Sequence, residues 1–304
     1  MTEETKNSLC EVISAELNGL TENVIANYQE NMQNRANNPF LLFEDPNAKK
    51  YMALGRSIDS QLGNRMQRII FHIARLRYGI CHVPNIVEIN ITDQAARNIE
   101  CVLYGIRCDL PIEEQNRDFN PYRQYVYINK HSTESQIKRA LKIKASSNSL
   151  EKRVFTFNAI PEESFATLAQ PRNKRGKVVN KILVDLLFFD CPLNALDQAN
   201  AFEIKMGGNL DTKNAKSNAE EVKMLSTILG FLANSSAYFA TCYGECSHAV
   251  KGDVEDILGD DAICNNREFW NKIIPSYLFT YEDFISVYAE VFRATGLENR
   301  LCAL

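Results

Sequence analysis

The fold is decided by two apolar segments, Lys181-Ile-Leu-Val-Asp-Leu-Leu-Phe-Phe189 and Ala201-Phe-Glu-Ile-Lys-Met206. Both segments are short and rich in aliphatic and aromatic residues, as β-strands are. The link between them begins with Asp190-Cys-Pro-Leu-Asn194, a composition that is typical of a turn. Together the three stretches predict a β-hairpin.

Three charged residues interrupt this apolar pattern. Asp185 stands in the middle of the first segment, where an ionised carboxylate is costly unless a cation or a hydrogen-bond donor compensates it. Glu203 and Lys205 are two residues apart on the second segment, so the strand period of two puts both on one face. A turn centred in the link pairs Leu186 with Phe202. Asp185 then lies opposite Glu203, and the two carboxylates and the ammonium group converge.

This group of side chains predicts a site for a hard divalent cation. The carboxylates of Asp185 and Glu203 and the backbone carbonyl of Ile204 suit Mg²⁺, which keeps several waters and binds phosphate oxygens. The metal would activate a water, and Lys205 would orient it and stabilise developing charge, which is the chemistry of phosphodiester hydrolysis. Asp190 is the alternative metal-binding aspartate, although its place at the turn displaces it from Glu203.

The same residues resemble the catalytic signature of a nuclease superfamily. Asp185 followed by Glu203-Ile204-Lys205 is similar to the signature of the PD-(D/E)xK nucleases. Val184 stands where that superfamily often has proline, which leaves the choice of aspartate open. Over roughly residues 50 to 275 the chain further resembles type II restriction endonucleases of the TdeIII-like group. The stretches that carry this resemblance are Gly55-Arg-Ser-Ile-Asp-Ser-Gln-Leu-Gly63, Met206-Gly-Gly-Asn-Leu-Asp-Thr-Lys-Asn-Ala215, the helix after Ser217, Tyr238-Phe-Ala-Thr241 and Glu268-Phe-Trp270.

The resemblance implies a homodimeric enzyme that cleaves double-stranded DNA at GGNCC-type sites with Mg²⁺. We expect 5′-phosphate ends, and a cognate DNA methyltransferase in the same system that forms no stable complex with this chain. The implied fold is α/β, with a central mixed β-sheet flanked by helices and helical additions at both ends. Two alternatives remain open. One is a repair or recombination nuclease that acts on DNA structure, and the other is a DNA-binding module in which the charged residues only form a salt-bridged strand pair.

A basic region precedes the predicted hairpin. Residues 130–181 contain twelve lysines and arginines but four glutamates, leaving about +8 within a chain whose net charge is −4. We expect DNA contacts from the end of this region and from a glycine-started loop after the second strand. The alternatives are a solvated basic surface and an ordinary turn. The predicted DNA-binding residues are Arg172, Lys174, Arg175, Lys177, Asn209, Thr212, Lys213, Asn214 and Lys216.

The remaining sequence predicts helices at both ends of the chain. We expect one elaborated domain, residues 1–304, with a mainly helical part (1–80), a sheet core (81–245) and a helical C-terminal part (246–304). A capping box, Ser217-Asn-Ala-Glu220, predicts a helix start. The predicted helices are Ser8–Gln33, Lys50–Tyr78, Arg267–Ile274 and Tyr281–Thr295, and the further strands are Ile86–Ile91, Cys101–Arg107, Tyr122–Ile128 and Ala237–Cys242.

Polar side chains on the second helix could serve function or only face solvent. We expect a solvated face from its arginines, with phosphate contact as the alternative, and Ser57 or Asp59 could approach the metal. These arginines are Arg56, Arg65, Arg68, Arg75 and Arg77.

Composition narrows the class of protein. The 304 residues are 45% hydrophobic and 24% charged, which excludes a disordered or fibrous chain. Nine scattered cysteines, no signal sequence and no apolar stretch of membrane-spanning length predict a cytoplasmic protein with reduced thiols and no membrane partner.

Zinc is a weak alternative at Cys242, Cys246, His248 and Cys264, whose spacing is not standard. The sequence lacks a Ser-His-Asp arrangement and a phosphate-binding Gly-x-x-x-x-Gly-Lys motif, which argues against acyl transfer and nucleotide hydrolysis.

Overall fold

The computed structural model divides the chain into two compact units. One unit comprises Met1–Ile70 and Pro275–Leu304, and the other comprises Phe71–Ile274. The described residues are 1–36, 46–79, 82–83, 86–106, 150–168, 181–182, 185–189, 198–208, 212–232 and 234–303. We refer to the two as the helical unit and the α/β unit. The helices at the two ends of the sequence therefore belong to one unit.

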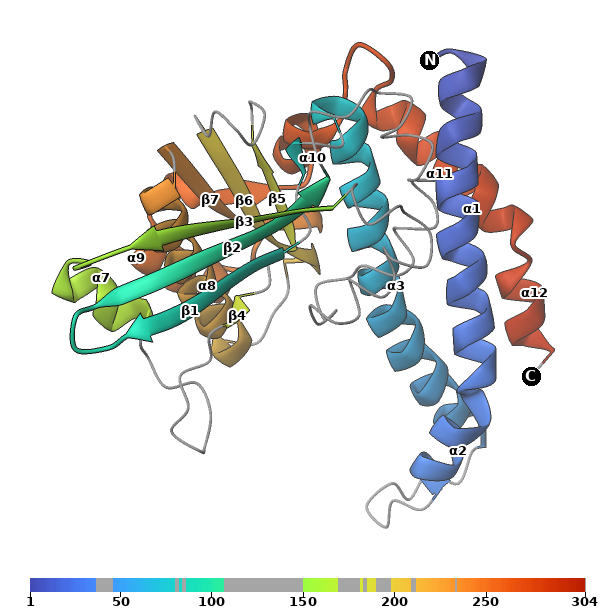
Figure 1. The fold of residues 1–304 in the computed structure, drawn as a ribbon. Helices are drawn as coiled ribbons and strands as arrows, with labels where there is room; N and C mark the ends of the chain where they lie inside the picture. Colours follow the sequence, from blue (N-terminus) through green and yellow to red (C-terminus); the bar gives the residue numbers. More distant parts are fainter. Residues whose placement is uncertain are drawn as a thin grey trace. The chain divides into compact units, whose positions relative to one another are not determined.

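The described part of the helical unit consists of helices (Figure 1). They are α1 (Glu3–Ala26), α2 (Tyr28–Ala36), the first part of α3 (Pro46–Tyr78), α11 (Tyr281–Ala294) and α12 (Leu297–Cys302). The helical pattern predicted over Ser8–Gln33 is confirmed except at Asn27, a turn residue between α1 and α2. The buried side chains of α1 end at Val24, shortly before this break.

Two ion pairs join α1 to the last helices. Lys6 Nζ lies 3.0 Å from Glu290 Oε2 of α11, and Arg300 of α12 donates a 2.8 Å hydrogen bond to Glu22. The apolar face of α1 lies at the predicted spacing, and its buried members are Leu9, Val12, Ile13, Leu17, Leu20 and Val24. The contacts of α11 bury Phe284, Val287 and Val291. The sequence pattern thus predicted α1 and α11 but not their common unit with α12.

A buried ion cluster links α1 to α3. Glu16 is 1% exposed, and its Oε2 lies 3.0 Å from Arg65 Nη1 and 3.5 Å from Arg68 Nη1. A Cβ on Gly19 would lie 2.5 Å from the Arg65 guanidinium, so glycine makes room for it. The expectation of a solvated arginine face is wrong for Arg65 and for Arg75, which are 8% and 7% exposed. Burial is possible for Arg65 because Glu16 supplies the compensating charge.

The described residues of the α/β unit form two four-stranded sheets. The first is antiparallel with strand order β3-β2-β1-β4, and the second is mixed with order β5-β6-β7-β8. The strands are β1 (Ile86–Asp93), β2 (Asn98–Ile106), β3 (Leu150–Phe157), β4 (Lys181–Ile182), β5 (Leu186–Phe189), β6 (Gln198–Gly207), β7 (Asn234–Tyr243) and β8 (Ile263–Asn265). The mixed α/β class is confirmed, whereas the prediction of one strand over Lys181–Phe189 is wrong.

The first apolar segment is divided between the two sheets, which explains that error. Lys181–Ile182 forms β4 and pairs with β1, whereas Leu186–Phe189 forms β5 and pairs with β6. Asp185 lies at a bend before β5, where its Oδ2 accepts the backbone N–H of Ile204 at 2.8 Å. A side chain that takes up a backbone donor competes with the strand ladder. We infer that this bond helps to set the start of β5 at Leu186.

Helices cover both faces of the mixed sheet (Figure 1). These helices are α7 (Glu162–Leu168), α8 (Thr212–Leu232), α9 (His248–Leu258), α10 (Arg267–Ile273) and the end of α3. On one face α8 shares a buried cluster with β5, β6 and β2, formed mainly by Leu225, Ile228, Leu229, Leu187, Phe189, Ala199, Ala201, Ile99 and Cys101. On the other face, Phe269 of α10 lies 5.7 Å from Phe202, and Tyr78 of α3 stacks on Phe188 at 3.9 Å between ring centroids.

Several boundaries differ from the sequence prediction. Helix α8 begins at Thr212, so the capping box over Ser217-Asn-Ala-Glu220 lies inside the helix and does not start it. Burial of Ala215 and Ala219 against Phe239 explains why packing extends the helix beyond the local signal. The elements β3, β8, α7, α9 and α12 were not predicted individually. The predicted strand Tyr122–Ile128 lies outside the described residues.

Candidate active site

Asp185 and Glu203 stand next to the first pair of the β5–β6 hairpin. Leu186 pairs with Phe202, as the sequence predicted, and Leu187 pairs with Ala201. Leu187 and Ala201 belong to the cluster that packs on α8. Glu203 lies two residues beyond Ala201 on β6 and therefore shares its face. Asp185 precedes β5 at a bend, and its bond to the Ile204 N–H brings its carboxylate to the residue after Glu203.

Both carboxylates are removed from solvent. Asp185 is 8% exposed and Glu203 is 6% exposed. The Ile204 N–H hydrogen-bonds to Asp185 Oδ2, and Lys205 Nζ donates a 2.6 Å hydrogen bond to Glu203 Oε1. The Lys205 side chain keeps 21% of its exposure, so the cluster reaches solvent through its cation. With both acids ionised, the three side chains carry a formal charge of −1.

The donor set fits a hard cation. Asp185 and Glu203 offer carboxylate oxygens, and the Ile204 carbonyl, directly after Glu203 in sequence, is the third predicted oxygen. Mg²⁺ takes one or two protein carboxylates and fills its other positions with water or phosphate oxygens, so it does not require a larger protein cage. Within the described ranges no group of three or more His, Cys, Asp and Glu side chains is arranged to hold a metal.

The zinc alternative finds no support in the geometry around β7 and β8. The thiols of Cys242, Cys246 and Cys264 and the His248 imidazole do not form a ligand group in the part of the chain that the structure describes. Burial raises the pKa of Cys246 to about 11 and that of Cys264 to about 12, and burial with the Asp185 charge raises the pKa of Cys242. Zinc binds the thiolate form, so these surroundings disfavour the ligand state.

A braced turn lies at the open end of β6 and β7, and sequence reasoning missed its role. A Cβ on Gly208 would meet the Glu245 backbone oxygen at 2.1 Å, so only glycine fits there. The Ser247 N–H donates to the Gly208 carbonyl at 3.1 Å. The Thr241 hydroxyl donates to the Gly244 carbonyl at 2.9 Å. The Gly-Gly pair in the sequence was the available signal for such a close approach.

The predicted DNA-binding residues fall into two groups. Thr212, Lys213, Asn214 and Lys216 lie in the first turns of α8, so their assignment to a loop is wrong, and Lys216 is exposed. The helix forms there because Ala215 packs against Phe239. Outside the described residues lie Asn209, Arg172, Lys174, Arg175, Lys177 and the alternative aspartate, Asp190.

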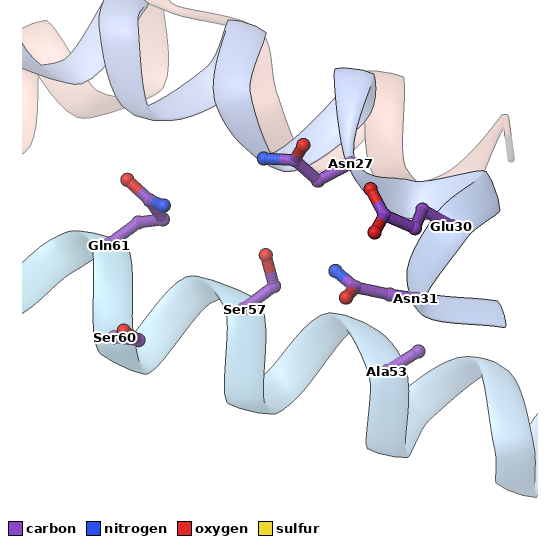
Figure 2. A pocket seen from close by; sticks show the side chains of 7 residues that line it. All are labelled: Asn27, Glu30, Asn31, Ala53, Ser57, Ser60 and Gln61. Atoms are coloured by element: carbon purple, nitrogen blue, oxygen red, sulfur yellow. The ribbon is translucent and has the colours of Figure 1, made fainter. Parts of the chain in front are cut away.

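The structure assigns Ser57 and Asp59 to the helical unit. Ser57 lines a polar pocket of about 290 Å³, which Figure 2 shows between α3 and the junction of α1 with α2. Asn27, Glu30 and Asn31 extend from the upper helices in the view toward Ser57 and Gln61 of α3. The structure thus shows Ser57 as part of the wall of this polar pocket. Asp59 is exposed and does not line the pocket.

Comparisons with known proteins add no family assignment. No family model matches the chain, and neither a curated protein nor a solved structure shows significant similarity to it. In the described part of the chain, no helix combines the length and the apolar character needed to cross a membrane.

Proposed function

We propose that the α/β unit hydrolyses phosphodiester bonds of double-stranded DNA with Mg²⁺. The observation that carries this proposal is the pair of buried carboxylates, Asp185 bonded to the Ile204 N–H and Glu203 bonded to the Lys205 ammonium at 2.6 Å. Carboxylate oxygens are the ligands that Mg²⁺ takes from proteins, and Mg²⁺ needs one or two of them. The site supports metal-assisted hydrolysis better than acyl transfer.

The roles of the residues follow from their chemistry. A bound Mg²⁺ supplies Lewis-acid activation of water and of a phosphate oxygen. Asp185, Glu203 and the Ile204 carbonyl would hold it, and Lys205 Nζ would donate hydrogen bonds to the attacking water and to the phosphate oxygen that gains charge. The water oxygen attacks phosphorus, the bond from phosphorus to O3′ breaks, and the O3′ leaving group takes up a proton. The products are a 5′-phosphate and a 3′-hydroxyl.

Site-specific cleavage as a type II restriction endonuclease is the form of this activity that the sequence resemblance favours. It implies a short palindromic site of the GGNCC type. A palindrome presents two equivalent strands, so a two-fold homodimer would place one active site on each. The cognate methyltransferase would protect the same site in host DNA.

One observation favours a second candidate. The 2.6 Å contact between Lys205 and Glu203 is also what a non-catalytic strand pair would show in a DNA-binding module. That module would bind DNA without cutting it, and its affinity would not depend on Mg²⁺ through Glu203.

The test is cleavage of unmethylated phage DNA by the full chain, with and without Mg²⁺. Glu203→Ala and Lys205→Ala are compared with Lys251→Ala, which removes an exposed lysine that pairs with Glu255 at 3.3 Å in the same unit. Sharp Mg²⁺-dependent bands that both active-site variants lose, and that the control keeps, are the expected result. A smear would favour a structure-directed or non-specific nuclease. Intact but bound DNA would contradict the catalytic proposal.

A further inference from the structure

An exposed tyrosine stands beside the candidate active site. Tyr243 is 60% exposed although it ends a strand whose preceding residues, from Phe239 to Cys242, are buried. Among the described residues, the other large aromatic side chains with such exposure are Tyr51 and Tyr277, and both belong to the helical unit. Among the described residues of the α/β unit, Tyr243 is therefore the aromatic side chain with this degree of exposure.

The strand register puts Tyr243 on the face of the catalytic residues. Lys205 pairs with Thr241 and Gly207 pairs with Tyr243 in the parallel ladder between β6 and β7. Paired residues of parallel strands share a face, and residues two apart lie on the same side. Tyr243 is thus displaced from Lys205 by one strand and by two residues, about 7 Å along the strand direction.

The ring of Tyr243 is held in place by glycine. A Cβ on Gly207 would lie 2.9 Å from Cζ of the ring and 3.0 Å from its hydroxyl oxygen, so the ring packs directly on the glycine backbone. The turn that follows is braced by the bond from Thr241 to the Gly244 carbonyl and by the contact of Gly208 with the 245–247 backbone. A side chain fixed in this way loses little conformational entropy when it binds a ligand.

We propose that the Tyr243 hydroxyl donates a hydrogen bond to a phosphate oxygen of the bound DNA strand, next to the phosphate that is cleaved. The inference rests on the proposed nuclease function and adds a substrate contact to it. Tyrosine hydroxyls are among the groups that bind the DNA backbone and fix its register on a protein. The contact places the strand so that the scissile phosphate meets Lys205, and it carries no sequence information.

The first test measures binding of the full chain to a duplex that contains the cleavage site mapped from wild-type digests, with Ca²⁺ in place of Mg²⁺. Tyr243→Phe keeps the ring on Gly207 and removes the hydroxyl, so the dissociation constant should rise roughly tenfold, as for loss of a hydrogen bond to a charged group. The dependence of affinity on salt should keep its slope, because no charge is lost. Tyr277→Phe, in the helical unit, is the control and should bind as the wild type does.

A second variant tests the position of the ring without removing its hydroxyl. Gly207→Ala places a methyl group against the ring and should also weaken binding, and this loss should vanish in the Tyr243→Ala background. Equal affinity of the wild type and Tyr243→Phe would overturn the inference while leaving the nuclease proposal intact. Wild-type protein that cuts no DNA would instead contradict the proposed function on which the inference rests.

Discussion

Among the described residues, two buried clusters of acidic and basic side chains differ in the number of acids and cations that they contain. In the helical unit, Glu16 is shared by Arg65 and Arg68, so the cluster has one acid and two cations. In the α/β unit, Asp185 and Glu203 accompany Lys205, so two acids meet one cation. Both clusters contain almost inaccessible carboxylates, and burial alone does not distinguish them.

The two clusters differ in the groups that surround their buried carboxylates. The guanidinium groups of Arg65 and Arg68 surround Glu16 and join α1 to α3, which is a packing role. Glu203 contacts the part-exposed Lys205, whereas Asp185 accepts a backbone N–H. Buried carboxylates beside a part-exposed lysine suit the proposed cation-binding site, whereas a carboxylate enclosed by cations suits a structural role.

The largest expected effect is on catalysis, from Asp185→Asn. Asparagine keeps the shape and an oxygen that can accept the Ile204 N–H, so the fold should persist while the charge is lost. We expect cleavage to fall by about a thousandfold, as for loss of one group that stabilises charge in the transition state. Digestion rates and circular dichroism are measured together. Asp190→Asn serves as the matched variant, and a greater loss of cleavage with it than with Asp185→Asn would transfer the metal-binding role to Asp190.

The next largest effect is on stability, from Glu16→Ala. This change leaves the buried Arg65 without the carboxylate that compensates it, which costs about 3–5 kcal/mol when a buried pair is broken. Chemical denaturation of the full chain measures the loss in the free energy of unfolding. Glu22→Ala, which removes an exposed pair with Arg300, should change little. Similar losses from both variants would remove the distinction between the buried cluster and a surface ion pair.

The burial of His72 on α3 also predicts that the stability of the fold depends on pH. Burial and then the Arg75 charge lower the pKa of His72 to about 4, against 6.5 for an ordinary histidine. The unfolded chain therefore binds a proton below pH 6.5 that the folded chain refuses, and stability falls by about 3 kcal/mol between pH 6.5 and 4. His72→Gln should remove this share of the slope. Parallel pH curves for the wild type and the variant would show that His72 does not contribute.

A smaller effect is expected from Gly208→Ala, which tests the turn beside the acidic cluster. The added Cβ meets the Glu245 backbone, which cannot move aside as a flexible side chain does. We expect a loss of about 1–3 kcal/mol and reduced cleavage, measured by thermal unfolding and digestion. Gly252→Ala, where a Cβ meets nothing within 4 Å, is the control. Equal behaviour of the two variants would show that the turn does not need glycine at position 208.

Local patterns predicted the parts of the structure that depend on neighbouring residues. The alternation around Asp185 and Glu203 and the short link between the strands were enough to predict the register in which Leu186 pairs with Phe202. The long apolar stripe likewise predicted α3, which begins four residues earlier than expected, at Pro46. These signals work because strand and helix periods are set by the backbone.

Long-range packing could not be predicted in the same way. The sequence shows that Arg65 is charged but not that Glu16, on another helix, would enclose it. The start of α8 depends on burial of Ala215 against Phe239, which overrides the capping signal at Ser217. The exposure of Tyr243 depends on a strand pairing with Gly207, and a lone aromatic residue in a strand pattern reads as core.

Calorimetric titration with Mg²⁺ tests the central claim most directly, because it measures the cation site apart from cleavage. Wild-type protein is compared with Glu203→Gln and with Glu16→Gln, one substitution in each cluster. We predict binding to the wild type and to Glu16→Gln, and loss of that binding in Glu203→Gln. Unchanged Mg²⁺ binding in Glu203→Gln, or no binding to the folded wild type, would contradict the assignment of the Asp185–Glu203 pair as a metal site.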